Sequence, residues 1–173
     1  MYGQEEPDTI YNSTRLVPRL GINGQKGYGV EVGLFLNQFH TRFPRHTKMT
    51  LLPYASSGFF LASEVSFRDF DKLIVGPKIG WELSVVGETY GSFLGAEFIN
   101  YTDFESYSPA LMLKIGLPLM WLNIGYGYTM YLEDSLKGEI GKHRLTLTYT
   151  INRIADENYK QIQKSLINKR KVD

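Results

Sequence analysis

Apolar and polar residues alternate with a period of two in eight separate stretches of the chain. Because successive side chains of a β-strand point to opposite faces, each stretch predicts a strand with one apolar and one polar face. The clearest stretch is 73–85, in which Leu73 and every second residue after it are apolar. The other predicted strands cover residues 15–23, 30–37, 58–68, 93–99, 111–119, 122–130 and 144–152. We therefore expect an all-β fold, an eight-stranded antiparallel up-and-down β-barrel.

The predicted strands place most of the chain in one domain, which suits its length of 173 residues. We expect a polar N-terminal segment over residues 1–13, the barrel over 14–153 and a short basic C-terminal tail over 154–173. Turn-forming residues such as Asn23-Gly24 separate most of the strands. The exception is a connection over residues 40–57, which is much longer than the others.

The polar face indicates which side of the barrel is inside. It is rich in glycine, which would weaken strands on a solvated surface but makes room for large side chains in a narrow lumen. It also carries charges of both signs at mid-strand, which compensate one another in an enclosed lumen. We therefore place the polar face inside and the apolar face outside. The predicted lumen charge network consists of Arg15, Arg19, Glu31, Glu64, Arg68, Lys78, Glu82, Glu97, Lys114 and Arg144.

The apolar faces run nearly uninterrupted for about ten residues per strand, the length that a tilted strand needs to cross a membrane. A spanning sheet must be closed, because an open edge is not tolerated in lipid. No stretch approaches the roughly 18 consecutive apolar residues of a spanning helix. The pattern therefore predicts a transmembrane barrel.

Residues 74–83, Ile-Val-Gly-Pro-Lys-Ile-Gly-Trp-Glu-Leu, resemble segments of uncharacterised Bacteroidetes-type outer-membrane proteins, as do residues 98–104 and 140–148. More broadly, most of residues 14–153 resemble the small outer-membrane barrels, the group that includes the transmembrane domain of outer-membrane protein A. The resemblance implies an outer-membrane location with both termini in the periplasm, and it carries no catalytic motif. The chain departs from this group because it continues to Asp173, whereas such barrels often end on an aromatic residue of the last strand. The first residues are polar and do not form a signal peptide, so we expect that signal to have been removed.

Composition and charge narrow the function further. The formal net charge of +1 gives no global field that would attract nucleic acid, so we expect no nucleic-acid partner. The absence of cysteine excludes disulfides, thiolate metal sites and cysteine nucleophiles. No cluster of His, Asp and Glu has the spacing of metal ligands, and we expect neither a metal nor a cofactor.

The three histidines, His40, His46 and His143, are the candidates for catalysis. A nucleophile needs a base within hydrogen-bond reach and a third group that orients the base. No serine stands at a matching same-face spacing from His143, and no such trio can be assembled from the local sequence. We therefore expect a protein that is not an enzyme, and a lipid A-modifying barrel enzyme is kept as an alternative.

Basic residues of the long connection and the tail are candidates for contact with a partner or with lipid headgroups. They are Arg42, Arg45, Lys48, Lys164, Lys169 and Arg170. The expected partners are outer-membrane lipid or lipopolysaccharide and other outer-membrane or periplasmic proteins. Side chains fill a lumen of eight strands, so the charge network is expected to plug the barrel. We expect a structural or interaction subunit, accessory to a larger outer-membrane complex, with a soluble lipocalin-like barrel for an apolar ligand as a second alternative.

Overall fold

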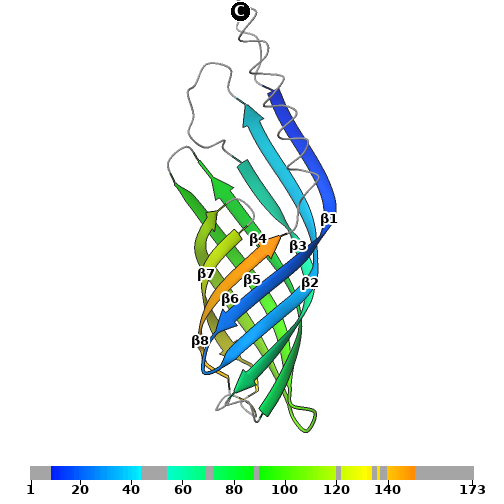
Figure 1. Cartoon of the computed structure of the whole chain (residues 1–173), viewed down its shortest axis with the longest axis vertical. Coiled ribbons are helices and arrows are strands. Elements are labelled where there is room, and N and C mark those ends of the chain that lie inside the picture. Colours follow the sequence, from blue (N-terminus) through cyan, green and yellow to red (C-terminus); the bar gives the residue numbers. More distant parts are fainter. Residues whose placement is uncertain are drawn as a thin grey trace, which may run out of the picture.

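The computed structural model of the chain describes residues 9–43, 54–68, 72–87, 90–119, 122–133, 136 and 140–150. They form a closed barrel in which each strand pairs antiparallel with its neighbours in the sequence and β1 pairs with β8 (Figure 1). The strands are β1 (Thr9–Gly24), β2 (Tyr28–Phe43), β3 (Tyr54–Arg68), β4 (Lys72–Val86), β5 (Gly91–Thr102), β6 (Tyr107–Leu119), β7 (Leu122–Tyr131) and β8 (His143–Thr150). The predicted eight-stranded up-and-down barrel is confirmed. The described residues include no helix long and apolar enough to cross a membrane.

Side chains alternate between the lumen and the outer surface, and the polar face is the one that lines the lumen. In β4, the outward-facing Leu73 and Ile79 are 43% and 54% exposed, whereas the inward-facing Lys78 and Glu82 are 3% and 2% exposed. The same division holds on every strand. We call the outward-facing apolar residues of the eight strands the apolar belt. The faces of the strands are therefore those that the alternation predicts.

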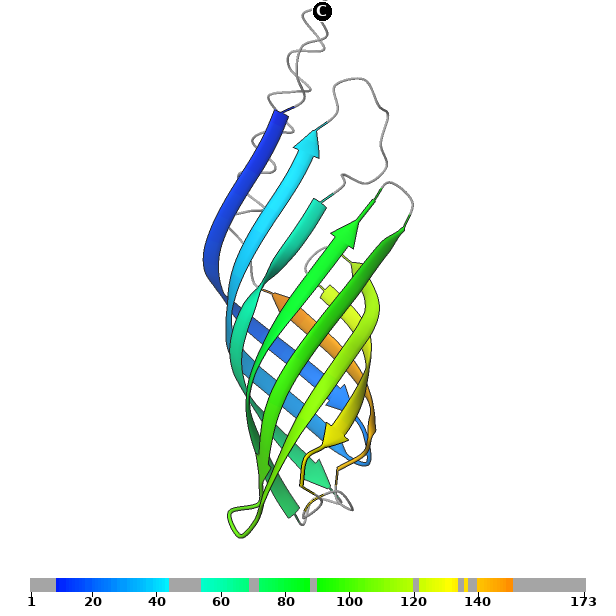
Figure 2. The same cartoon turned by 180° about the vertical axis from the view of Figure 1, so that it is seen from behind.

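The two ends of the barrel differ in shape. The turn end carries the connections β1–β2, β3–β4, β5–β6 and β7–β8, and the terminal end is where β1 begins and β8 ends. Within the described residues, β1 has 16 residues and β8 has 8, and the two strands pair from Arg19 to Gly24. The starts of β1 and β3 and the end of β2 rise beyond the end of β8, as both views show (Figures 1 and 2). We call this part the strand extension.

The strand extension corrects the predicted connection over residues 40–57. β2 continues to Phe43, β3 begins at Tyr54, and Thr41 pairs with Tyr54. β1 likewise begins at Thr9, within the segment that the sequence pattern places before the barrel. The prediction failed because Gln38 and His40 are outward-facing polar residues, so the alternation stops although the pairing continues. Residues 154–173 lie outside the described residues.

Candidate functional site

Among the described residues, eight buried charged side chains lie in the lumen, and we call them the charge network. Four are carboxylates and four are cations, each at most 3% exposed, and they come from every strand except β7. Equal numbers of opposite charges make the network neutral, which matters because an unpaired charge is costly to bury. Its members are Arg19, Glu31, Glu64, Lys78, Glu82, Glu97, Lys114 and Arg144.

Arg19 of β1 connects the two sides of the lumen. Its Nε donates to Glu31 Oε1 at 2.5 Å, and its terminal nitrogens Nη1 and Nη2 donate to both oxygens of Glu82, the second at 2.6 Å. The guanidinium also lies 4.2 Å from the centre of the Phe60 ring, which packs against Val17, Phe35 and other apolar lumen residues. Bidentate pairing and stacking on an aromatic face use the planar geometry of arginine, which a lysine would not reproduce.

Lys78 lies among three carboxylates. The barrel register puts Glu31 of β2 directly opposite Glu64 of β3, an arrangement that repels. The Lys78 Nζ lies 2.5 Å from Glu31 Oε2, 3.2 Å from Glu64 Oε2 and 3.4 Å from Glu97 Oε2. One ammonium group therefore neutralises the two facing carboxylates and links them to a third strand.

The ion pairs close into a ring. The Lys114 Nζ lies 2.6 Å from Glu82 Oε1 and contacts the carboxylate of Glu97. Positive and negative groups thereby alternate around six residues, in the order Arg19, Glu31, Lys78, Glu97, Lys114, Glu82 and back to Arg19. We call these six residues the charge ring, and it crosses the lumen from wall to wall.

Arg144 of β8 extends the network toward the turn end. Its Nη1 donates to Glu64 Oε2 at 2.6 Å, and Glu64 also accepts a hydrogen bond of 2.8 Å from Ser66. Its Nη2 donates to the Tyr101 hydroxyl and, at 3.0 Å, to Gln25 Oε1 of the β1–β2 turn. The guanidinium thus joins the charge ring, through Glu64 and Lys78, to the residues that cover the turn end.

Glycines on the neighbouring strands leave room for several of the long lumen side chains. Lys114 is flanked by Gly95 of β5 and Gly127 of β7, and Glu97 lies opposite Gly80. A Cβ at Gly95 would lie 3.1 Å from Lys114 Cε and 3.3 Å from Glu82 Cγ. These glycines have a steric role, because a side chain in their place would press on the charge network.

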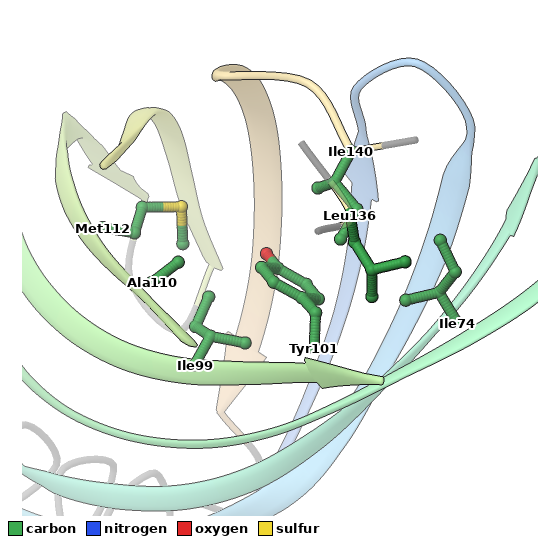
Figure 3. Packing of buried hydrophobic residues seen from close by; sticks show 7 residues of the cluster. All are labelled: Ile74, Ile99, Tyr101, Ala110, Met112, Leu136 and Ile140. Atoms are coloured by element: carbon green, nitrogen blue, oxygen red, sulfur yellow. The ribbon is translucent and has the colours of Figure 1, made fainter. Parts of the chain in front are cut away.

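An apolar cap, which the sequence analysis missed, closes the turn end. Leu136 and Ile140 of the β7–β8 connection are 1% exposed and pack on Ile74, Ile99 and Tyr101 in the lumen, with Ala110 and Met112 beside them (Figure 3). The Ile140 N–H donates to the Leu136 carbonyl at 3.1 Å, and the Tyr131 hydroxyl donates to the Gly141 carbonyl at 3.1 Å. The spacing of four between two aliphatic residues in a polar connection is the signal that could have found them.

A partly enclosed pocket opens on the other side of the charge ring, toward the terminal end. Its lining includes Phe35 and Glu82, together with hydroxyl and amide side chains. These polar lining residues are Asn37, Ser56, Ser84, Asn123 and Thr150. Because Glu82 belongs to the charge ring, the pocket ends where the ring begins.

Not every predicted lumen residue joins the network. Arg15 is partly exposed and makes no ion pair with any described residue. Arg68 ends β3, but its side chain is not among the described ones. Of the predicted contact residues, the Arg42 side chain is likewise not described. The others, Arg45, Lys48, Lys164, Lys169 and Arg170, lie outside the described residues.

The described histidines do not form a catalytic trio. His40 Nδ1 lies 2.8 Å from Asn12 Oδ1 on the outer surface, and His143 Nδ1 bonds to the Tyr126 hydroxyl. No carboxylate bonds to either ring within the described part of the chain, and His46 lies outside it. No three His, Asp or Glu residues gather as metal ligands in the parts of the chain that the structure describes.

The arrangement can fill a lumen, hold the strands in register and block passage, because its charged groups bond to one another. Comparison with known proteins adds no family to this description: no family model, curated protein or solved structure matches the chain.

Proposed function

We propose that this chain is a non-enzymatic outer-membrane β-barrel that serves as a structural or interaction subunit. The observation that carries the proposal is the combination of an apolar belt around the outside with a neutral, filled lumen. A barrel in water would bury its apolar face, whereas a barrel in lipid exposes it.

The height of the apolar belt suits a membrane. On β2 it runs from Tyr28 to Leu36 and on β4 from Leu73 to Val85. At about 3.4 Å per residue and a tilt of about 40°, these runs rise about 20 and 30 Å, which brackets the ~25 Å of a typical barrel belt. Beyond the belt the outer face becomes polar, as expected for the strand extension in the aqueous phase.

Exposed aromatic residues lie near the turn end of the belt. Tyr28 at the start of β2 is 80% exposed, Phe104 in the β5–β6 turn is 71% exposed and Tyr107 at the start of β6 is 61% exposed. Aromatic residues gather where a membrane meets water, because their rings are apolar and tyrosine keeps a polar tip. They support a membrane boundary at this end.

The filled lumen favours a scaffold over a channel. Any solute would have to break the charge ring and displace the apolar cap, both of which are buried. We assign partner contact to the strand extension and to the basic residues that the sequence offers, which are Arg42, Arg45, Lys48, Lys164, Lys169 and Arg170. Placing the termini in the periplasm, as in the outer-membrane barrels that the sequence resembles, would point the extension toward periplasmic proteins or a larger outer-membrane complex.

Fractionation and electrophoresis test this proposal. The protein is expected to partition with outer-membrane fractions and to migrate differently in a detergent gel before and after heating. In planar bilayers it is expected to show no steady ion conductance. Recovery as a soluble monomer without detergent would refute the membrane location, and a stable open conductance would refute the plugged lumen.

The alternatives are less well supported by specific observations. A soluble barrel for an apolar ligand needs an apolar cavity, but Lys78, Glu82 and other charges occupy the lumen. A lipid A-modifying enzyme needs an activated nucleophile at the outer wall. Tyr126 bonds to His143 there, but no carboxylate of the described residues bonds to the histidine to complete a catalytic trio.

A further inference from the structure

One polar cluster interrupts the apolar belt, on the outer wall near the turn end. It consists of Tyr126 and Tyr128 of β7, the exposed Lys142 and His143, which begins β8. We propose that this cluster binds the phosphate of a membrane lipid headgroup. The inference rests on the proposed function, since it requires that the belt lie in a membrane.

Two tyrosines hold the His143 ring on the outer wall. Its Nδ1 bonds to the Tyr126 hydroxyl, and the two ring centres are 5.9 Å apart. The ring of Tyr128 meets the His143 ring edge to face, with 5.4 Å between the ring centres and an interplanar angle of 62°. The backbone is fixed as well, because the Lys142 carbonyl accepts a 2.8 Å hydrogen bond from the Thr129 N–H. The imidazole is thus positioned before any ligand arrives.

Three polar groups of the cluster have no partner among the described residues. The second ring nitrogen of His143, the Tyr128 hydroxyl and the Lys142 ammonium make no hydrogen bond or ion pair with any described residue. Their surroundings on the wall are apolar, since Leu113 pairs with Tyr128 and Leu145 pairs with Tyr126. Unpartnered polar groups are costly in hydrocarbon. The cluster therefore belongs at headgroup level, where the lipid supplies the missing partners.

A phosphate group can bind to all three of these polar groups. Its oxygens accept hydrogen bonds from the hydroxyl and the imidazole, and its negative charge complements lysine. Leu145 pairs on its other side with Gly24, where an added Cβ would meet nothing within 4 Å. The wall is open there, which leaves space for the acyl chain of the same lipid. This apolar neighbourhood is the reason to assign the site to a lipid and not to a free anion.

Native mass spectrometry of the detergent-folded protein tests the inference. The probes are phosphatidic acid and diacylglycerol with the same acyl chains, which differ only in the phosphate, and inorganic phosphate. Phosphatidic acid should bind, and the double variant Lys142→Ala/His143→Ala should lower its binding at least fivefold. The matched control is Tyr149→Phe, an outward-facing tyrosine at the other end of β8, which should bind as the parent chain does.

Equal binding of diacylglycerol, or unchanged binding by the double variant, would overturn the site. Binding of inorganic phosphate with the same dependence on the two residues would make it a free-anion site and overturn the lipid assignment. Heat-modifiable migration, measured on the same samples, confirms that each variant is folded. If the double variant does not fold, the single variant Lys142→Ala replaces it. This variant should also weaken the binding of phosphatidic acid. If the parent chain did not partition with membranes, the proposed function would fail, and fractionation would show this independently of lipid binding.

Discussion

Replacing Lys78 with methionine removes the cation that separates two facing carboxylates. Methionine has a similar length and no charge, so the change keeps most of the packing and deletes the ammonium group. Glu31 and Glu64 would then face each other across the β2–β3 pair without the group that now lies 2.5 Å and 3.2 Å from them. The charge network would carry a net charge of −1 in a buried lumen.

The expected loss in the free energy of unfolding follows from the number of ion pairs that the substitution breaks. Removing one partner of a buried pair costs about 3–5 kcal/mol. Lys78 contacts three carboxylates and Lys114 contacts two, so we expect Lys78→Met to lie at the upper end, about 5 kcal/mol, and Lys114→Met below it. The double variant Lys78→Met/Glu31→Gln removes the facing pair and restores neutrality, and it should recover about 2 kcal/mol.

Urea unfolding of the protein folded in lipid vesicles measures these differences, with tryptophan fluorescence as the signal and linear extrapolation to water. The control is Glu105→Met, which removes an exposed charge from the β5–β6 turn and should change the free energy of unfolding by less than about 0.5 kcal/mol. If Lys78→Met cost no more than this control, or if adding Glu31→Gln lowered stability further, the charge ring would not have the role assigned to it.

Two further substitutions test the packing of the lumen, with the same unfolding assay. Gly95→Val places a side chain against Lys114 and should cost about 1–3 kcal/mol by overpacking, whereas Ala96→Val on the outer face should be nearly neutral; equal effects would contradict a filled lumen. Leu136→Ala in the apolar cap should lower the free energy of unfolding by about 2–5 kcal/mol. Leu132 lies in the same connection but is 62% exposed, so Leu132→Ala should lower it by less than about 0.5 kcal/mol. The Leu136 variant should still not conduct ions, because the charge ring remains, and the appearance of conductance would show that the cap alone closes the lumen.

The inward-facing residues could be predicted from the sequence, because alternation assigns each residue of a strand to a face. The partners of each charge could not, since they depend on register and closure: Arg19 and Glu82 are 63 positions apart. The strand extension was missed because its outer face is polar, so the chain pairs there without the alternation that marks a strand. Leu136 and Ile140 were missed because a connection between strands is expected to be polar.

The central claim is that the apolar belt faces lipid and ends where the strand extension begins. The chain contains no cysteine, so single variants carry one spin label each. Labels at Leu34→Cys and Leu94→Cys, which lie in the belt, should be accessible to oxygen and protected from a water-soluble nickel reagent in reconstituted vesicles. A label at Gln38→Cys, only four residues beyond Leu34 on the same face of β2, should show the reverse. Equal accessibility of all three labels to the nickel reagent would contradict the account.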